Sequence, residues 1–182
     1  AAFFNIAKCL KLGVPVISGT TGWLDNYEHA IKLCKENNGA FIYASNFSLG
    51  VNIFFELNKH LAKMMSQLKQ YHVSIEEIHH TEKLDAPSGT AITLAEGIIS
   101  QHDEYNKWLL NQNKKQTIPI TAKRIANVPG THSIEYKSNT DTINITHTAH
   151  TREGFALGAV VAAEWILGKT GVFSMKDVLN IG

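Results

Sequence analysis

The chain has 182 residues, with 17 Lys and Arg against 16 Asp and Glu, so its formal net charge at pH 7 is +1. A charge this close to zero gives no strong attraction toward nucleic acid or an anionic membrane surface, and the apolar runs fall far short of the roughly 20 residues of a membrane span. The hydrophobic fraction of 44% is enough for a core in one large or two small domains.

Two cysteines, Cys9 and Cys34, are too few for a disulfide framework and favour a reducing cytoplasm. The sequence begins without methionine, inside an amphipathic helical pattern over Ala1 to Leu12 that differs from a signal peptide. It also contains no Gly-x-Gly-x-x-Gly loop after a strand. From its start inside a helix, we expect an upstream portion to be missing.

Helical patterns and short apolar segments alternate at the start of the chain. The periodicity predicts helices over Ala1–Leu12 and Asn26–Asn37, each followed by a buried strand, Val14–Ser18 and Ala40–Tyr43. Such alternation predicts a parallel sheet and an α/β fold. The small-residue helix predicted over Ala156–Leu167 and the segment after it are expected to return to this part.

Each of these strands delivers a turn to the same edge of the predicted sheet. The turns are Gly19-Thr20-Thr21-Gly22 and Ala44-Ser45-Asn46-Phe47. In a doubly wound sheet the carboxyl edge is the ligand crevice, although a turn of this composition is by itself more often a tight connection.

The middle of the chain has a different organisation. A long helix is predicted over Val51–Leu68, with Leu57 and Leu68 on its apolar face, and the polar stretch His102–Gln116 is predicted to be a helix tail and an exposed connection. Three extended segments with period-two alternation follow, at residues 117–124, 131–136 and 141–147, the last two joined by a hairpin. The change to an antiparallel or mixed sheet predicts a second domain over residues 49–152, so that the first comprises 1–48 and 153–182.

The densest group of chemically active residues is Glu76 to Ala91, read as EEIHHTEKLDAPSGTA. In the extended stretch Ser74–His80, Glu77 and His79 lie on one side and His80 on the other, which argues against His79 and His80 as a chelating pair. Lys83 lies where the strand should end, since Pro87 cannot continue it. By itself, a histidine pair in a strand serves as a satisfied hydrogen-bonding group about as often as it serves a function. A lysine at a strand end is usually only solvated.

A short helix is predicted to follow over Ala91–Ile99. The backbone N–H groups of Ser88, Gly89 and Thr90 at its start form a ready anion site, and Gly89 allows close approach. The simpler interpretation of Ser-Gly-Thr is a helix cap. The convergence of a cation, an acid/base group and an anion cradle on one turn favours a functional site.

The run from Glu77 to Ala91 resembles the signature of the 4-hydroxy-tetrahydrodipicolinate reductases, or dihydrodipicolinate reductases, of the diaminopimelate and lysine pathway. The pattern E-x-H-H-x-x-K-x-D-x-P-S-G-T-A is long and chemically mixed, so a chance match is improbable. Gly130-Thr131-His132 and the segment Gly171–Leu179 also resemble elements of that family, although Ile125-Ala126 stands where the family has a glycine after the arginine.

The resemblance implies an oxidoreductase that reduces a cyclic dicarboxylic imine with NADPH or NADH. It implies a Rossmann-like parallel-sheet domain, here partial, and an α+β domain for substrate binding and assembly of a homotetramer. His79 is expected to be the general acid, because imidazole titrates near neutrality, and Lys83 to donate a proton or hold a carboxylate. His80, Gly89 and Thr90 are expected to bind substrate. The segments expected to line the nicotinamide end of the cofactor are Gly19, Thr20 and Thr21 with Ala44, Ser45, Asn46 and Phe47.

Two other classes of function stay open at this point. A metal-dependent hydrolase could use His72, His79, His80 and Asp85, but metal ligands must converge within about 2.0–2.2 Å of one ion, whereas adjacent strand histidines diverge. A non-catalytic remnant or binding protein is the third class. We expect a small dicarboxylate ligand, no metal, and no nucleic-acid or membrane partner.

Overall fold

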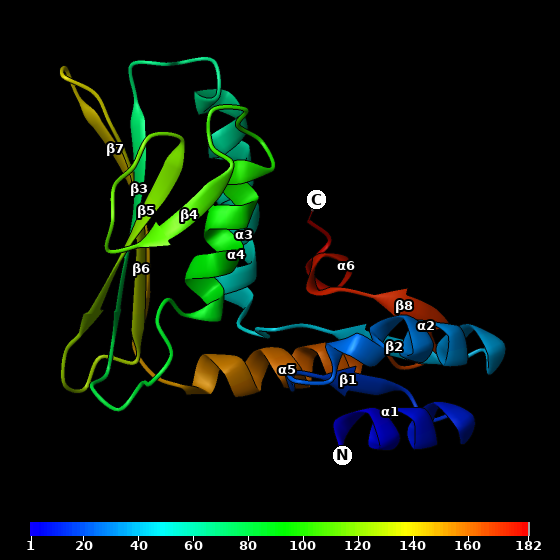
Figure 1. Cartoon of the computed structure of the whole chain (residues 1–182). Helices are drawn as coiled ribbons and strands as arrows, with labels where there is room; N and C mark the ends of the chain where they lie inside the picture. Colours follow the sequence, from blue (N-terminus) through cyan, green and yellow to red (C-terminus); the bar gives the residue numbers. More distant parts are fainter. Residues whose placement is uncertain (182) are drawn as a thin grey trace. The chain divides into compact units, whose positions relative to one another are not determined.

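The computed structural model describes residues 1–181, which form two compact units (Figure 1). The first unit comprises Ala1–Asn52 together with the chain from Glu153 on, and the second comprises Ile53–Arg152. The protein is therefore mixed α/β, with one unit interrupted by the other. Among the described residues, no helix is long and apolar enough to cross a membrane.

The first unit is built on a small parallel sheet. Its helices are α1 (Ala2–Lys11), α2 (Tyr27–Glu36), α5 (Glu153–Trp165) and α6 (Met175–Leu179), with a short 3-10 turn, η1 (Leu24–Asn26). Its strands are β1 (Val16–Ser18), β2 (Ala40–Tyr43) and β8 (Gly171–Phe173), in the order β1-β2-β8 and all parallel. The prediction of a parallel sheet to which the end of the chain returns is confirmed.

Helices cover both faces of this sheet. Because consecutive residues of β2 point to opposite sides, neighbouring side chains of this strand belong to different cores. Phe41 packs in a core with Leu10 of α1 and Cys34 of α2. Ile42 packs in a second core with Ala162 of α5 and Met175 of α6. A short strand that is apolar at every position is typical of a sheet buried on both faces, and this explains the uninterrupted sequence Ala-Phe-Ile-Tyr.

The second unit has a five-stranded mixed sheet. Its elements are α3 (Leu49–Met65), whose first turn belongs to the first unit, α4 (Gly89–Ile99), β3 (His72–His79), β4 (Lys107–Leu110), β5 (Thr117–Arg124), β6 (Gly130–Lys137) and β7 (Thr142–Ala149). The order is β4-β5-β3-β6-β7, with β3 parallel to β5 and antiparallel to β6. The predicted hairpin is confirmed as the antiparallel pair β6 and β7.

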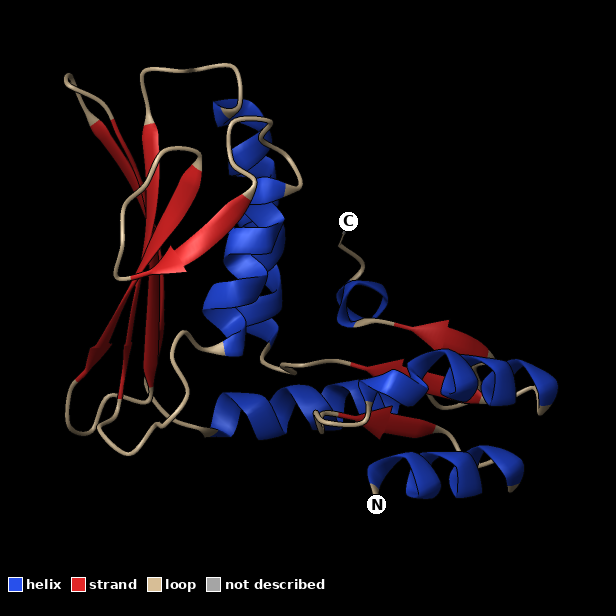
Figure 2. Ribbon diagram, in the orientation of Figure 1, coloured by secondary structure: helices blue, strands red, loops and turns tan. Residues whose placement is uncertain are grey.

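Helices α3 and α4 lie side by side on one face of this sheet (Figure 2). The core between these helices and the sheet contains Leu94 and Ile98 of α4 and the strand residues Ile75, Ile120 and Ile134, each at most 1% exposed. In β3 every second residue from Val73 to His79 is buried, which confirms the predicted alternation. The same period that buries Ile75 therefore buries Glu77 and His79.

Two predictions for this unit are wrong. The stretch His102–Gln116 is not merely an exposed connection, because it contains β4, and His102 and Tyr105 are 3% and 7% exposed. A four-residue edge strand with partly buried side chains lacks a clear alternating signal. Leu57 and Leu68 are 48% and 41% exposed, since the apolar stripe of α3 is narrower than predicted and Leu68 lies beyond the helix end.

Gly158 of α5 provides a test of packing in the first unit. A methyl group at this position would overlap the backbone carbonyl of Phe47, whereas one at Gly154 in the same helix would lie 3.8 Å from the Ser48 Oγ. Gly158→Ala should therefore lower the free energy of unfolding by about 1–3 kcal/mol, as overpacking does. Gly154→Ala is the matched control and should change it by less than about 1 kcal/mol. Equal urea midpoints for the two variants would contradict this packing.

Candidate active site

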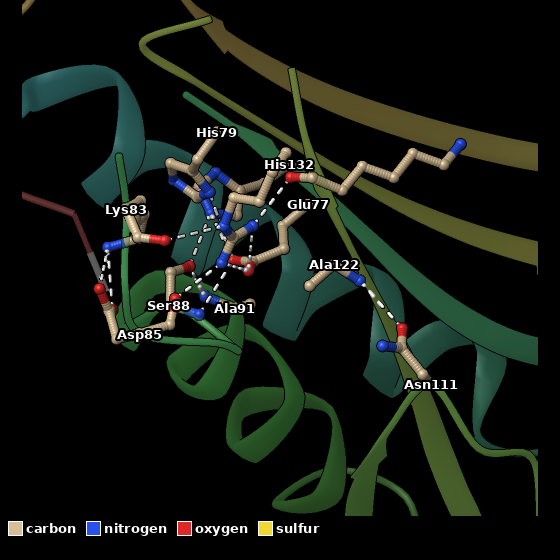
Figure 3. A network of polar contacts seen from close by, with 11 residues as sticks. Glu77, His79, Lys83, Asp85, Ser88, Ala91, Asn111, Ala122 and His132 are labelled. Carbon is tan, nitrogen blue, oxygen red and sulfur yellow. Dashed lines mark hydrogen bonds and ion pairs between the residues drawn. The ribbon is translucent and has the colours of Figure 1, made fainter. Parts of the chain in front are cut away.

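The candidate site lies at the carboxyl end of β3, where Glu77, His79 and His132 point toward one another (Figure 3). Glu77 is fully buried and His79 is 7% exposed, on the face of β3 covered by the helices. His80 lies on the other face, as predicted, and is partly exposed. His132 of β6 is directly opposite Glu77 in the antiparallel register. The sheet therefore places two histidines beside one buried carboxylate.

Both oxygens of the Glu77 carboxylate accept hydrogen bonds from outside β3. Oε1 accepts from Nη1 and Nη2 of Arg124, at 3.3 and 3.2 Å. Oε2 accepts the backbone N–H of Ser88 at 3.0 Å. A buried carboxylate needs such partners, because its transfer out of water is otherwise very costly.

Arg124 also fixes the turn that carries Lys83. Its Nε donates to the Lys83 carbonyl at 3.2 Å, and its Nη2 donates to the Asp85 carbonyl at 2.7 Å. The end of β5 is thus tied both to the buried carboxylate and to the backbone of the turn. A rigid planar guanidinium suits this role, since it presents five donors in a fixed geometry.

The Lys83 ammonium forms an ion pair with Asp85. Nζ lies 2.8 Å from each oxygen of the carboxylate, and the two side chains are 22% and 61% exposed. The hydrogen bond from Lys83 lowers the pKa of Asp85 below its usual range. The cation expected to serve substrate is therefore present at the strand end and is held by a neighbour two residues away.

The start of α4 is held by Ser88. The Ser88 Oγ accepts the Ala91 N–H at 3.2 Å and lies 3.1 Å from Nε2 of His132. The expectation that Ser88 supplies a free backbone N–H is wrong, because that group is bonded to Glu77. Gly89 is exposed, and a methyl group built there would meet no atom within 4 Å. The open side of the helix start is thus at Gly89, with Thr90 next to it.

The imidazole of His79 is enclosed from two sides. Its Nδ1 lies 3.6 Å from the Glu77 Oε2 and has no hydrogen-bond partner among residues 1–181. The opposite edge approaches Gly130 so closely that a Cβ there would be 3.2 Å from Nε2. Burial lowers the pKa of His79, and the Glu77 charge opposes that shift. Burial also lowers the pKa of His132, to about 3, so this ring is neutral near pH 7.

The residues expected to line the cofactor belong to the first unit and follow β1 and β2. The Ala44 N–H donates to the Ser18 carbonyl at 3.1 Å, which joins the two segments where the parallel strands end. A Cβ on Gly19 would lie 3.2 Å from the Phe47 ring, so these two positions are in contact. Gly19, Thr20, Thr21 and Ser45 are exposed, Ala44 and Asn46 are partly exposed, and Phe47 is buried.

Comparison with known proteins identifies relatives of this chain. Residues 50–179 match the family model described as dihydrodipicolinate reductase, C-terminus. The 4-hydroxy-tetrahydrodipicolinate reductase of Christiangramia forsetii is 61% identical over 180 residues, which cover 99% of this chain and 75% of that protein. The chain belongs to the dihydrodipicolinate reductase family. The Neisseria gonorrhoeae enzyme of the same name is 35% identical over 97% of this chain and 68% of its own length.

The fold is also that of a solved dihydrodipicolinate reductase. The dipicolinate-bound enzyme from Paenisporosarcina sp. TG-14 superimposes with a TM-score of 0.73, at 24% identity, over 95% of this chain and 67% of that one. At this identity the likeness concerns the fold alone. It agrees with the mixed α/β architecture of the two units.

The metal ligands considered from the sequence are not the residues that the structure brings together in this member of the dihydrodipicolinate reductase family. Instead of His72, His79, His80 and Asp85, the ligand atoms that lie within 4.8 Å of one another belong to Glu77, His79 and His132. A metal ion there would lie beside the Arg124 guanidinium, on an oxygen that already accepts the Ser88 N–H. The contacts fit a hydrogen-bonded carboxylate better than a metal ligand.

Sequence reasoning assigned no role to Glu77, Arg124 or His132, although all three lie in segments that resemble the dihydrodipicolinate reductases. One signal for Glu77 was available. In an alternating strand, a glutamate two residues after Ile75 and two before His79 falls on the buried face and needs a partner. The identity of that partner depends on sheet register, which places Arg124 of β5 next to His79 of β3.

The lowered pKa of His132 predicts a dependence of stability on pH. The pKa of His132 is about 3 in the folded protein and 6.5 in the unfolded chain. Its contribution to the free energy of unfolding is therefore complete above pH 6.5 and is lost as the pH falls toward 3. Between pH 6.5 and 5 the loss should be about 1–2 kcal/mol, which His132→Gln should remove. Urea unfolding at several pH values measures it. Between pH 7 and 8 the two proteins should show the same pH dependence, and parallel curves down to pH 5 would contradict the assignment.

Proposed function

We propose that this protein reduces 4-hydroxy-tetrahydrodipicolinate to tetrahydrodipicolinate with NADPH or NADH, in diaminopimelate and lysine biosynthesis. Support comes from the 61% identity to a reductase of that name. The observation that carries the proposal is the gathering of His79, His80, Lys83 and the start of α4 at one end of β3. The overall reaction adds one hydride and one proton to the substrate and releases one water molecule.

The proton-donating role is assigned to His79 and Lys83. His79 lies next to an anion that favours its protonated form, which suits a general acid. Lys83 provides an ammonium group that can donate to the developing negative charge or hold a substrate carboxylate. Because its present partner Asp85 is a largely exposed carboxylate, a substrate carboxylate can replace that contact with little loss.

One substrate carboxylate is assigned to the start of α4, with Gly89 and Thr90 as its contacts and His80 as a further substrate ligand. The N-terminus of an 11-residue helix favours an anion through its dipole and its outward backbone N–H groups. The open space over Gly89 fits this assignment, because a ligand can approach the backbone there without displacing a side chain.

The first unit is proposed to be part of a Rossmann-like dinucleotide-binding domain, formed by residues 1–48 and 153–182. Its exposed turns after parallel strands fit a nucleotide, and Gly19 leaves space that a side chain would fill against Phe47. Gly19, Thr20, Thr21 and residues 44–47 would hold the nicotinamide end of the cofactor. When bound, the reduced nicotinamide supplies the hydride.

Residues 49–152 are proposed to bind substrate and to assemble the enzyme, as a homotetramer in the cytoplasm. The half-exposed face of the five-stranded sheet opposite α3 and α4 offers a surface for such assembly. Both cysteines are free, which fits a reducing compartment. The partners would be the small dicarboxylate and other copies of the protein.

The catalytic assignment predicts the effect of two substitutions in the complete enzyme. His79→Gln and Lys83→Ala should each lower kcat by about 10²-fold or more, since each group acts on charge that develops in the reaction. Cofactor affinity, measured by fluorescence titration, should be nearly unchanged. Unaltered turnover in either variant would remove that residue from the mechanism, and a large loss of cofactor affinity would also count against it.

The carboxylate assignment predicts a selective effect at Gly89. Pyridine-2,6-dicarboxylate should compete with substrate in the unaltered enzyme, and Gly89→Val should weaken both ligands while leaving the nucleotide constant unchanged. Because a Cβ at this position meets no atom, the thermal stability of the variant should be close to that of the parent. Removal of the Thr90 hydroxyl should cost about 1–2 kcal/mol of binding. Full-strength competition against Gly89→Val would place the carboxylate elsewhere, with Lys83 and His80 as the next candidates.

A further inference from the structure

Glu77 is a charged group where packing alone would favour an apolar one. It is fully buried, in line with Ile75 on the helix-covered face of β3. Replacement of a buried ion pair by apolar residues is often neutral or stabilising, so stability is a weak reason for a carboxylate at this position. Its surroundings give a stronger reason.

The carboxylate is held rigidly and faces the proposed general acid. Arg124 binds one oxygen, and the Ser88 N–H binds the other. That second oxygen is also the one that lies 3.6 Å from Nδ1 of His79. Gly130 lies against the far edge of the same imidazole, where even one Cβ would be 3.2 Å from Nε2. The ring is thus confined between an anion and a backbone surface.

We propose that Glu77 is a positioning residue for His79, which orients the imidazole through Nδ1 and stabilises its protonated form. The inference rests on the proposed function, because it assigns Glu77 to the general acid of that reaction. The carboxylate itself transfers no proton. It holds the ring with Nδ1–H toward the anion, so that Nε2 is the nitrogen that gives up and recovers the proton.

The alternative orientation is electrostatically unfavourable. If neutral His79 carried its proton on Nε2, the Nδ1 lone pair would face a carboxylate oxygen at 3.6 Å, in a site with little water. With the proton on Nδ1, the same distance becomes an attractive contact. Protonation of the second nitrogen makes the ring a cation beside an anion, which favours the charged form.

Other charged groups act on the same ring and set the balance. Lys83 and Asp85 act from the turn and Arg124 from β5, while His132 of β6, whose ring centroid is 5.0 Å from that of His79, is neutral near pH 7. Burial and the two cations lower the pKa of His79, whereas Glu77 and Asp85 raise it, with Glu77 the larger of the two. Loss of the Glu77 charge should therefore lower the His79 pKa and leave less of the acid form at neutral pH.

The test is the pH profile of kcat for Glu77→Gln in the complete enzyme. The variant should lose about 10-fold or more of kcat at pH 7.5, a part of the roughly 10²–10⁴-fold that a positioned acid contributes. Its alkaline limb should move to lower pH, so that some activity returns on acidification, while the cofactor KM stays unchanged. A uniform loss across the pH range, or a wild-type profile, would overturn the proposal.

Glu76→Gln is the matched control, because Glu76 precedes Glu77 in the same strand but faces the other side, where it pairs with Lys123 at 2.6 Å. It should leave kcat and the pH profile unchanged. A shift of the alkaline limb in Glu76→Gln as large as that in Glu77→Gln would overturn the inference, since the effect would then come from net charge. If Glu77→Gln fails to fold because Arg124 is left unpaired, the double variant Glu77→Gln with Arg124→Met removes both charges. Its alkaline limb should move in the same direction but by less, because Arg124 itself lowers the His79 pKa.

A second double variant separates this inference from the proposed function. Glu77→Gln combined with His79→Gln should be no slower than His79→Gln alone, because a residue that acts through His79 has nothing left to act on. Multiplied losses would overturn the positioning role while leaving His79 as the acid. Full activity of His79→Gln alone would instead overturn the assignment of the acid, and with it the inference.

Discussion

A carboxylate that is removed from water must find its hydrogen bonds within the protein, and Glu77 finds them on two other elements. Arg124 donates from the end of β5 and Ser88 from the start of α4, while His132 of β6 lies directly opposite Glu77 in the sheet. Each of these residues has a second partner that belongs to the candidate site. The start of α4, the end of β5 and the imidazole of His79 therefore all meet at the same buried charge.

This convergence explains the order of residues in the motif. Alternation in β3 places Glu77 and His79 on one face and His80 on the other, so two adjacent histidines take different environments. The turn after the strand returns Ser88 to the Glu77 carboxylate, which fixes the first turn of α4 with its open side at Gly89. The spacing from Glu77 to Ser88 is thus set by the length of a turn that must begin and end at one carboxylate.

Much of this could be predicted from the sequence, because the signals are local. The faces of β3, the start of α4 after Pro87, the parallel strands and the terminal return to the first sheet follow from periodicity and turn residues. The features that the sequence does not predict depend on the register between strands. Arg124 lies 47 residues from Glu77 and His132 lies 55 residues away, and no local pattern indicates which donors meet a buried acid. The strand β4 was missed for a related reason, since a short edge strand owes its position to its neighbour β5.

The burial of His79 shows how one neighbourhood can serve both the fold and the chemistry. Desolvation makes the protonated ring less favourable, and the anion beside Nδ1 restores part of that loss. The central claim is that Glu77 sets the orientation and the protonated nitrogen of His79. The most direct measurement is ¹⁵N NMR of the imidazole in the complete, ligand-free protein above the pH at which His79 is protonated. We expect Nδ1 to carry the proton and Glu77→Gln to weaken that preference. A neutral ring protonated on Nε2 in the unaltered protein would contradict the account.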